Sequence, residues 1–284
     1  MSPMSSALVL GGGGITGIAW EVGLLRGLQE AGVDLTDADT VIGTSAGSVV
    51  GALLTTGTTL ADMYAAQLAD PSGEIGAAFG RLTMLRYAAL VLAPGGDTRK
   101  RRRLGQASLR AATKPGATPQ EERVQVIRER VPTHLWPDRD LRITVVDADT
   151  GEFVVLDQHG PADLVQAVAS SCAVPLVWPP VTVDGHRYVD GGARSSTNAD
   201  VAEGADPVVV LAPLPRSLSR QHSIPAQLAR TGAAATAVVS PDATALAAIG
   251  RNVLDPAQRE ASARAGYEQA ALVVDEVRAA WLGD

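Results

Sequence analysis

The sequence predicts an α/β protein with three layers, in which helices cover both faces of a mostly parallel central sheet. The order of its first elements carries this prediction. Residues 7–10 form a short apolar run that ends in glycines, and apolar residues then recur at helical spacing as far as Gly32. A second short strand at residues 41–42 and a second helical stretch follow directly. A strand–helix–strand–helix order gives parallel strands with helices packed on the sheet.

The rest of the chain is expected to extend this sheet. Proline and glycine interrupt a helical stretch at residues 61–130, which we interpret as an inserted helical cap over one edge. Asp184-Gly185 is typical of a hairpin turn between two short strands. Residues 224–282 are expected to be mostly helical, and residues 1–284 to form one domain. Further strands are expected at residues 141–146, 153–156, 181–183, 187–189 and 208–211.

Composition excludes several classes of protein. Hydrophobic residues make up 46% and charged residues 19% of the 284 residues, which excludes a disordered or collagen-like chain. A formal net charge of −7 argues against nucleic-acid binding through a global basic field. We expect no metal site, because Cys172 is the single cysteine and the four histidines lack metal-ligand spacing.

The sequence also predicts where the protein resides. The first six residues contain no basic residue, unlike the start of a signal peptide. No stretch offers about 20 apolar residues without glycine, proline or charge, which a membrane-spanning helix needs. We therefore expect a cytoplasmic protein.

A glycine-rich turn joins the first strand to the first helix. Gly12, Gly13 and Gly14 leave backbone N–H groups free there, beside the positive end of the helix dipole. Such a turn can hold a phosphate, a dinucleotide or a reaction oxyanion. Together with Gly17 it fits a dinucleotide-binding fingerprint, but no acidic residue follows the second strand, where the ribose would need one.

A second turn has the form of a nucleophile elbow. Gly43-Thr44-Ser45-Ala46-Gly47 lies between a short strand and a helix, the context in which Gly-x-Ser-x-Gly exposes a serine hydroxyl. Gly43 and Gly47 have no Cβ to obstruct a tight turn, and the helix dipole favours a developing alkoxide. Ser45 is therefore a candidate nucleophile.

A nucleophilic serine needs a base. Asp190 ends a predicted strand and is followed by Gly191 and Gly192, which leave space around its carboxylate. Partial desolvation would raise the basicity of such a carboxylate. His222 is the alternative, because it is the histidine whose chain position suits a hydrolase triad.

In combination, these motifs resemble those of the patatin-like phospholipases, and the resemblance runs from Leu8 to about Asp206. The resemblance implies Ser45 as nucleophile and Asp190 as base of a Ser–Asp dyad. It also implies that the N–H groups of Gly12, Gly13 and Gly14 form an oxyanion hole. The implied activity is hydrolysis of fatty-acyl esters through an acyl-enzyme, without metal or cofactor.

One position departs from the family pattern. The family usually has Arg or Lys before the last glycine of the loop, whereas this chain has Thr16, which weakens any prediction that phosphate binds there. The alternatives are a dinucleotide-binding protein that uses Gly12 to Gly17 and a catalytically idle, lipid-binding member of the same fold. The basic run from Arg99 to Arg103 is a candidate for peripheral contact with anionic lipid.

Overall fold

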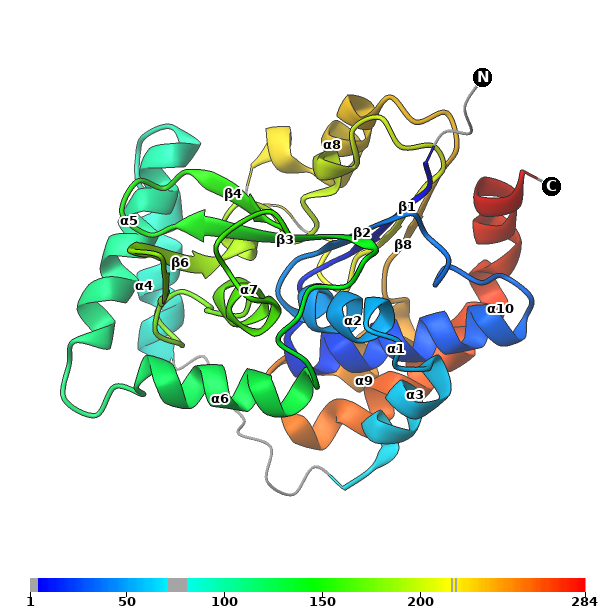
Figure 1. Cartoon of the computed structure of the whole chain (residues 1–284), viewed down its shortest axis with the longest axis horizontal. Coiled ribbons are helices and arrows are strands. Elements are labelled where there is room, and N and C mark those ends of the chain that lie inside the picture. The colour runs from blue at the N-terminus through cyan, green and yellow to red at the C-terminus, as the bar shows by residue number, and fades with distance from the viewer. Residues whose placement is uncertain (1–4, 71–80, 216, 218, 284) are drawn as a thin grey trace.

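The computed structural model describes residues 5–70, 81–215, 217 and 219–283, and its strands form one eight-stranded sheet (Figure 1). The sheet order is β5-β6-β3-β2-β1-β7-β8, and β4 also pairs with β3. The strands β1, β2, β7 and β8 and the start of β3 run parallel, while β4, β5 and β6 are joined by antiparallel pairs. Their bounds are β1 Ala7–Leu10, β2 Thr40–Gly43, β3 Asp140–Asp147, β4 Phe153–Leu156, β5 Val181–Val183, β6 His186–Asp190, β7 Val208–Leu211 and β8 Thr236–Val239.

Helices cover both faces of this sheet, which confirms the predicted α/β/α layers. In Figure 1, α1, α2, α9 and α10 lie on one face and α8 lies on the other. The short 3-10 segment η2 (Ala199–Ala202) packs beside α8. The helices are α1 Gly14–Glu30, α2 Ala46–Thr55, α3 Leu60–Leu68, α4 Arg81–Leu92, α5 Asp97–Ala112, α6 Gln120–Arg130, α7 Leu164–Ser171, α8 Ile224–Thr231, α9 Ala243–Ile249 and α10 Arg259–Leu282.

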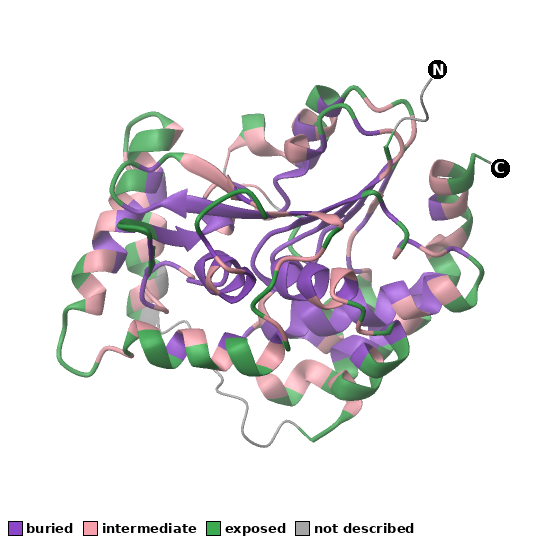
Figure 2. Cartoon of the chain, viewed as in Figure 1, coloured by how far each residue is buried: buried purple, intermediate pink, exposed green. Residues whose placement is uncertain are grey.

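The strands β1 and β7 are apolar throughout because both of their faces are buried (Figure 2). Successive side chains of β1 alternate between two cores. Leu8 and Leu10 join the core under α1, α2 and α10, whereas Ala7 and Val9 join the core under η2 and α8. The same alternation continues in β7.

The terminal regions of the described chain meet through the close packing of α1 against α10. Glycines permit this approach, because a Cβ on Gly23 would lie 2.0 Å from the Ala263 carbonyl oxygen. A Cβ on Gly266 would likewise lie 2.3 Å from the Trp20 carbonyl oxygen. The Trp20 indole also donates a hydrogen bond to Gln269 across this interface, at 2.9 Å.

Most predicted elements are present, with one clear error. The antiparallel hairpin of β5 and β6 turns at Asp184 and Gly185, both at positive φ, as predicted. The prediction of a mostly helical region at 224–282 is wrong at residues 236–239, which form β8 beside β7. Alanine dominates the sequence around this strand, and the parallel pairing with β7 outweighs that local helical preference.

The described part of the segment between α2 and β3 contains the helices α3, α4, α5 and α6, together with turns and loops. The helices α4 and α5 lie side by side at one end of the molecule (Figure 1). Their inner residues Val91 and Leu104 pack on Val146 and Val189 of the sheet. Over the described ranges, no helix combines the length and apolarity needed to cross a bilayer.

Candidate active site

Ser45 lies in a sharp turn between β2 and α2. Its φ of 51° and ψ of −113° are unusual for a residue with a side chain. The neighbouring glycines are required by close contacts: a Cβ on Gly47 would lie 2.1 Å from the Leu10 carbonyl oxygen, and one on Gly43 would lie 2.5 Å from Ser48 Cα. The turn is as sharp as a nucleophile elbow requires.

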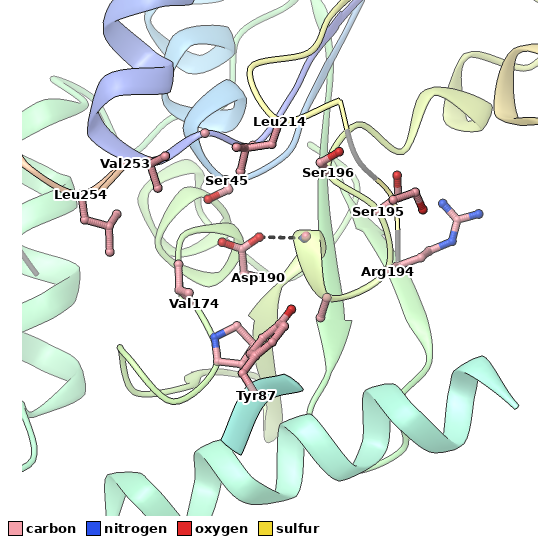
Figure 3. A pocket seen from close by; sticks show the side chains of 17 residues that line it. Ser45, Tyr87, Val174, Asp190, Arg194, Ser195, Ser196, Leu214, Val253 and Leu254 are labelled. Carbon is pink, nitrogen blue, oxygen red and sulfur yellow. Dashed lines mark hydrogen bonds between the residues drawn. The ribbon is translucent and has the colours of Figure 1, made fainter. Parts of the chain in front are cut away.

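Hydrogen bonds from another element hold this elbow in place. The Ser45 N–H donates to Ser171 Oγ at 2.9 Å, and the Ser171 hydroxyl donates to the Thr144 carbonyl at 2.8 Å. The Ser48 hydroxyl donates to the Ser45 carbonyl at 2.6 Å. The end of α7 and the strand β3 therefore fix the backbone of Ser45 and leave its side chain directed at the cavity (Figure 3).

Asp190 faces the same cavity from the end of β6, 3% exposed. The Gly192 N–H donates to Asp190 Oδ1 at 2.7 Å, as the dashed line in Figure 3 shows. Burial raises the pKa of Asp190 to about 6, against the opposing effects of the Ser45 hydroxyl, the Gly192 N–H and the positive charge of Arg123. The structure thus brings Ser45 and Asp190, 145 positions apart in the chain, into side-chain interaction.

The glycine loop lies next to Ser45, at the N-terminus of α1. A Cβ on Gly12 would be 3.5 Å from Ser45 Cβ, but the Gly12 N–H already donates to the Ser196 carbonyl at 2.7 Å. The expectation that Gly12 offers a free donor is therefore wrong for this structure. Gly13 caps α1 and Gly14 begins it, positions whose N–H groups have no acceptor within a helix. Both residues line the cavity.

Gly14 and Gly17 serve this loop in different ways. Gly14 has a φ of 63°, and a Cβ there would lie 2.5 Å from the Val253 carbonyl oxygen. A Cβ on Gly17 would lie 3.3 Å from Pro213 Cβ and 3.6 Å from Ala46 Cβ. Gly17 therefore allows α1 to approach the start of α2 closely.

The cavity beside Ser45 and Asp190 has a volume of about 350 Å³. Its wall is largely apolar, which suits a hydrocarbon chain more than a dinucleotide. Several of its residues come from parts of the chain in which no sequence motif indicates a role. The labelled apolar residues in Figure 3 are Tyr87, Val174, Leu214, Val253 and Leu254.

A buried asparagine joins the two turns of the site. Asn198 has left-handed backbone geometry, which asparagine tolerates well. Its side-chain amide donates to Thr44 Oγ1 at 3.1 Å, to the Gly191 carbonyl at 3.3 Å and to the Ser195 carbonyl at 2.8 Å. Sequence reasoning missed this residue, although a polar residue eight positions after Asp190 was visible; its partners come together only in the fold.

His222 takes no part in this cavity. Its Nε2 lies 3.3 Å from Asp97 Oδ2 in a separate, smaller pocket beyond Ala193 and Arg194. Burial, and then the charge of Arg194, lower its pKa. The geometry therefore favours Asp190 over His222 as the partner of Ser45.

Thr16 occupies the position at which the family usually has Arg or Lys. The Thr16 hydroxyl donates to the Val253 carbonyl at 3.3 Å, and the side chain is fully buried. It is not among the residues that line the cavity. Within the described ranges, no group of three or more His, Cys, Asp or Glu residues is arranged to hold a metal ion.

Comparison with known proteins identifies the family. The model for patatin-like phospholipases matches residues 8–203, which is more than half of the chain. The chain therefore belongs to the patatin-like phospholipase family. Its general class is accordingly that of the lipid hydrolases, and the resemblance seen in the sequence motifs is confirmed.

Solved structures with low sequence identity are also similar to this chain. VipD from Legionella pneumophila is 15% identical, with 96% of this chain and 67% of that chain covered and a TM-score of 0.47. ExoU in its heterodimeric complex with SpcU from Pseudomonas aeruginosa is 18% identical, with a TM-score of 0.38. That alignment covers 96% of this chain but 52% of ExoU, so the chain spans about half of that protein. No curated protein matches the chain.

Proposed function

We propose that this protein is a serine acyl hydrolase that cleaves fatty-acyl esters of lipids through a Ser45–Asp190 dyad. The observation that carries the proposal is the interaction of the Ser45 hydroxyl with a buried carboxylate at the wall of an apolar cavity. Family membership supports the lipid substrate class. Phospholipase A, lysophospholipase and carboxylesterase activities all fall within this proposal.

The first half-reaction acylates the serine. Asp190 accepts the hydroxyl proton while Ser45 Oγ attacks the ester carbonyl carbon. The N–H groups of Gly13 and Gly14 stabilise the resulting oxyanion, and each such donor is typically worth about 3 kcal/mol. Asp190 then returns the proton to the leaving alcohol oxygen as the carbon–oxygen bond breaks.

The second half-reaction releases the fatty acid. Asp190 removes a proton from a water molecule that attacks the acyl-enzyme carbonyl, and the same glycine amides stabilise the second oxyanion. Collapse of this intermediate breaks the bond to Ser45 Oγ, which recovers its proton from Asp190. Each step uses groups of this chain, without metal or cofactor.

A fluorophosphonate probe tests the nucleophile. We expect covalent labelling of the wild type and complete loss of labelling in Ser45→Ala. Ser217→Ala is the matched control, because Ser217 lines the same cavity and should leave labelling intact. Lack of labelling in the folded wild type would contradict the proposal and favour a catalytically idle, lipid-binding protein.

The dinucleotide alternative finds less support. The loop from Gly12 to Gly17 opens onto an apolar cavity, and β2 is followed by Thr44 and Ser45, where a ribose-binding acid would be needed. Titration with NAD or NADP, followed by intrinsic fluorescence, tests this alternative directly. Saturable binding at micromolar concentration would revive it.

A further inference from the structure

The helix α4 is apolar on both of its faces. Leu82, Leu85 and Leu92 are 80%, 68% and 81% exposed. Their spacing of three and seven residues places them on one side of the helix. On the opposite side, Val91 packs against the sheet and Tyr87 lines the catalytic cavity. One short helix thus joins an exposed leucine face to the wall of the active site.

The leucine face of α4 (Leu82, Leu85 and Leu92) lies on the helix that also contributes Tyr87 to the wall of the cavity. Tyr87 comes from the inner side of the same helix, and Leu214, 42% exposed, lines the cavity from the loop after β7. Figure 3 shows Tyr87 and Leu214 on opposite sides of Asp190. A hydrocarbon surface that covered the leucine face would therefore contact the same helix that forms part of the cavity wall.

Cations flank the end of this leucine face. The exposed residues 94–96 connect Leu92 to α5, in which Arg99 and Arg102 are exposed. The Arg103 guanidinium donates to the Pro94 carbonyl at 2.7 Å, which places a further charge two residues from Leu92.

Two other charged residues of α5, Arg101 and Asp97, are engaged elsewhere. Arg101 is buried and donates to the Gly151 carbonyl at 2.8 Å, so the basic run contributes fewer free charges than its sequence indicates. Asp97, the acidic residue of α5, faces His222 and Gln221. The exposed charged side chains at the start of α5 are therefore cationic, although the whole chain carries −7.

We propose that the leucine face of α4, together with Arg99, Arg102 and Arg103, is a docking surface for an anionic lipid bilayer. The inference rests on the proposed function, because docking there would deliver acyl chains to Ser45. The leucine side chains enter the apolar boundary of the bilayer, and the guanidinium groups contact lipid phosphates.

A second copy of the chain is a poorer occupant of this surface. Two-fold pairing brings the same patch of both copies together. The arginines beside Leu92 would then approach their own equivalents without described acidic residues of α4 or α5 to neutralise them, since Asp97 is engaged with His222. Anionic headgroups, in contrast, complement both the apolar face and its charged border.

Co-sedimentation with vesicles tests the docking surface without catalysis. Ser45→Ala serves as the background, so that the vesicles stay intact whether or not the proposed chemistry is correct. We expect binding to phosphatidylcholine vesicles that contain phosphatidylglycerol, weaker binding to phosphatidylcholine alone, and loss of binding at high salt. Leu85→Asp combined with Leu92→Asp should weaken binding by about tenfold or more. The matched control is Leu272→Asp, a leucine 76% exposed on α10, which should bind normally.

Two further measurements complete the test. Arg99→Glu with Arg102→Glu should abolish the preference for anionic vesicles, whereas Lys114→Glu beyond the other end of α5 should keep it. With Ser45 intact, the double leucine variant should hydrolyse a soluble short-chain ester normally but lose activity on vesicles. Equal vesicle binding by the wild type and the double leucine variant would overturn the proposal. A dimer in sedimentation velocity that Leu85→Asp and Leu92→Asp dissociate would also overturn it and assign the surface to self-association.

Discussion

At the scale of single residues, the environment of Asp190 sets how the proposed chemistry responds to pH. Because only the ionised carboxylate can accept the serine proton, kcat/KM should rise with pH and reach half of its plateau near the pKa of about 6. Asp190→Asn should lower kcat by about 10³-fold, within the usual range for loss of a general base. A pH–rate profile on a soluble ester checks both expectations.

The same carboxylate should cost the protein stability. The folded pKa of about 6 lies above the ordinary 3.8, so the folded protein holds this proton more tightly than the unfolded chain does. The contribution of Asp190 to the free energy of unfolding is therefore fully present below pH 3.8 and is lost as the pH rises towards 6. Asp190→Asn should therefore raise the melting temperature at pH 8 but not at pH 3.8. If Asp190→Asn is inactive but its melting temperature at pH 8 does not exceed that of the wild type, the carboxylate is less buried than described.

Glu21 is a second buried carboxyl, on the side of α1 away from solvent. It is fully buried, and neither of its oxygens has a hydrogen-bond partner of standard geometry among the described residues. Burial raises its pKa well above 4.5, although the Gly11 backbone partly opposes this. The proton is therefore retained in the folded state and released on unfolding above pH 4.5, so stability falls as the pH rises.

Glu21→Gln should remove this pH dependence. We expect its melting temperature to exceed that of the wild type at pH 8 by about 2–4 °C for each kcal/mol gained, with little difference at pH 4. Glu203→Gln, at an exposed position, is the matched control and should melt like the wild type at both values. A Glu21→Gln variant that melts lower at pH 8 would contradict the assignment of a protonated, unpaired carboxyl.

At the scale of elements, the site depends on how two turns are held together. The elbow after β2 and the turn after β6 are linked by Asn198, through Thr44 on one side and the Gly191 carbonyl on the other. Catalysis needs the hydroxyl and the carboxylate in register, and a displacement of about 1 Å can cost about 10²-fold in rate. We therefore propose that Asn198 is a positioning residue, which acts through its neighbours Thr44 and Gly191.

Asn198→Asp tests this link, because it keeps the shape and the tolerance of left-handed geometry but replaces the amide donor. We expect kcat to fall by at least about tenfold with a smaller change in KM, and the midpoint of the pH–rate profile to shift upwards as a second carboxyl approaches Asp190. Asn198→Gly, which adds no charge, should lower kcat without that shift. An unchanged midpoint in Asn198→Asp, in protein folded by circular dichroism, would limit the residue to a structural role.

At the scale of the whole molecule, the sequence predicts those features that are determined by residues close together in the chain. The elbow around Ser45, the hairpin before Asp190 and the layered fold each follow from short motifs and their order. The strand β8 was missed because its pairing partner β7, and not its own alanine-rich surroundings, determines it. The occupied N–H of Gly12 could not be foreseen, because its acceptor Ser196 is far away in the chain.

The sheet and the helices continue beyond the part of the chain that the family model matches. The family match ends at residue 203, but β7 and β8 continue the same sheet and α10 packs along α1. We propose that all of the described residues form one patatin-like unit, in which the helices from α3 to α6 are an insertion.

The residues that line the cavity come from two parts of the chain, before and after residue 203. Ser45, Asp190 and the glycine loop lie within the part of the chain that the family shares, whereas Leu214, Val253 and Leu254 lie beyond residue 203. The residues proposed to break the ester bond therefore lie in the part that the family model matches, whereas part of the cavity wall comes from residues after 203. Substitutions at Leu214, Val253 or Leu254 would therefore change the wall of the cavity without altering any residue that the family model matches.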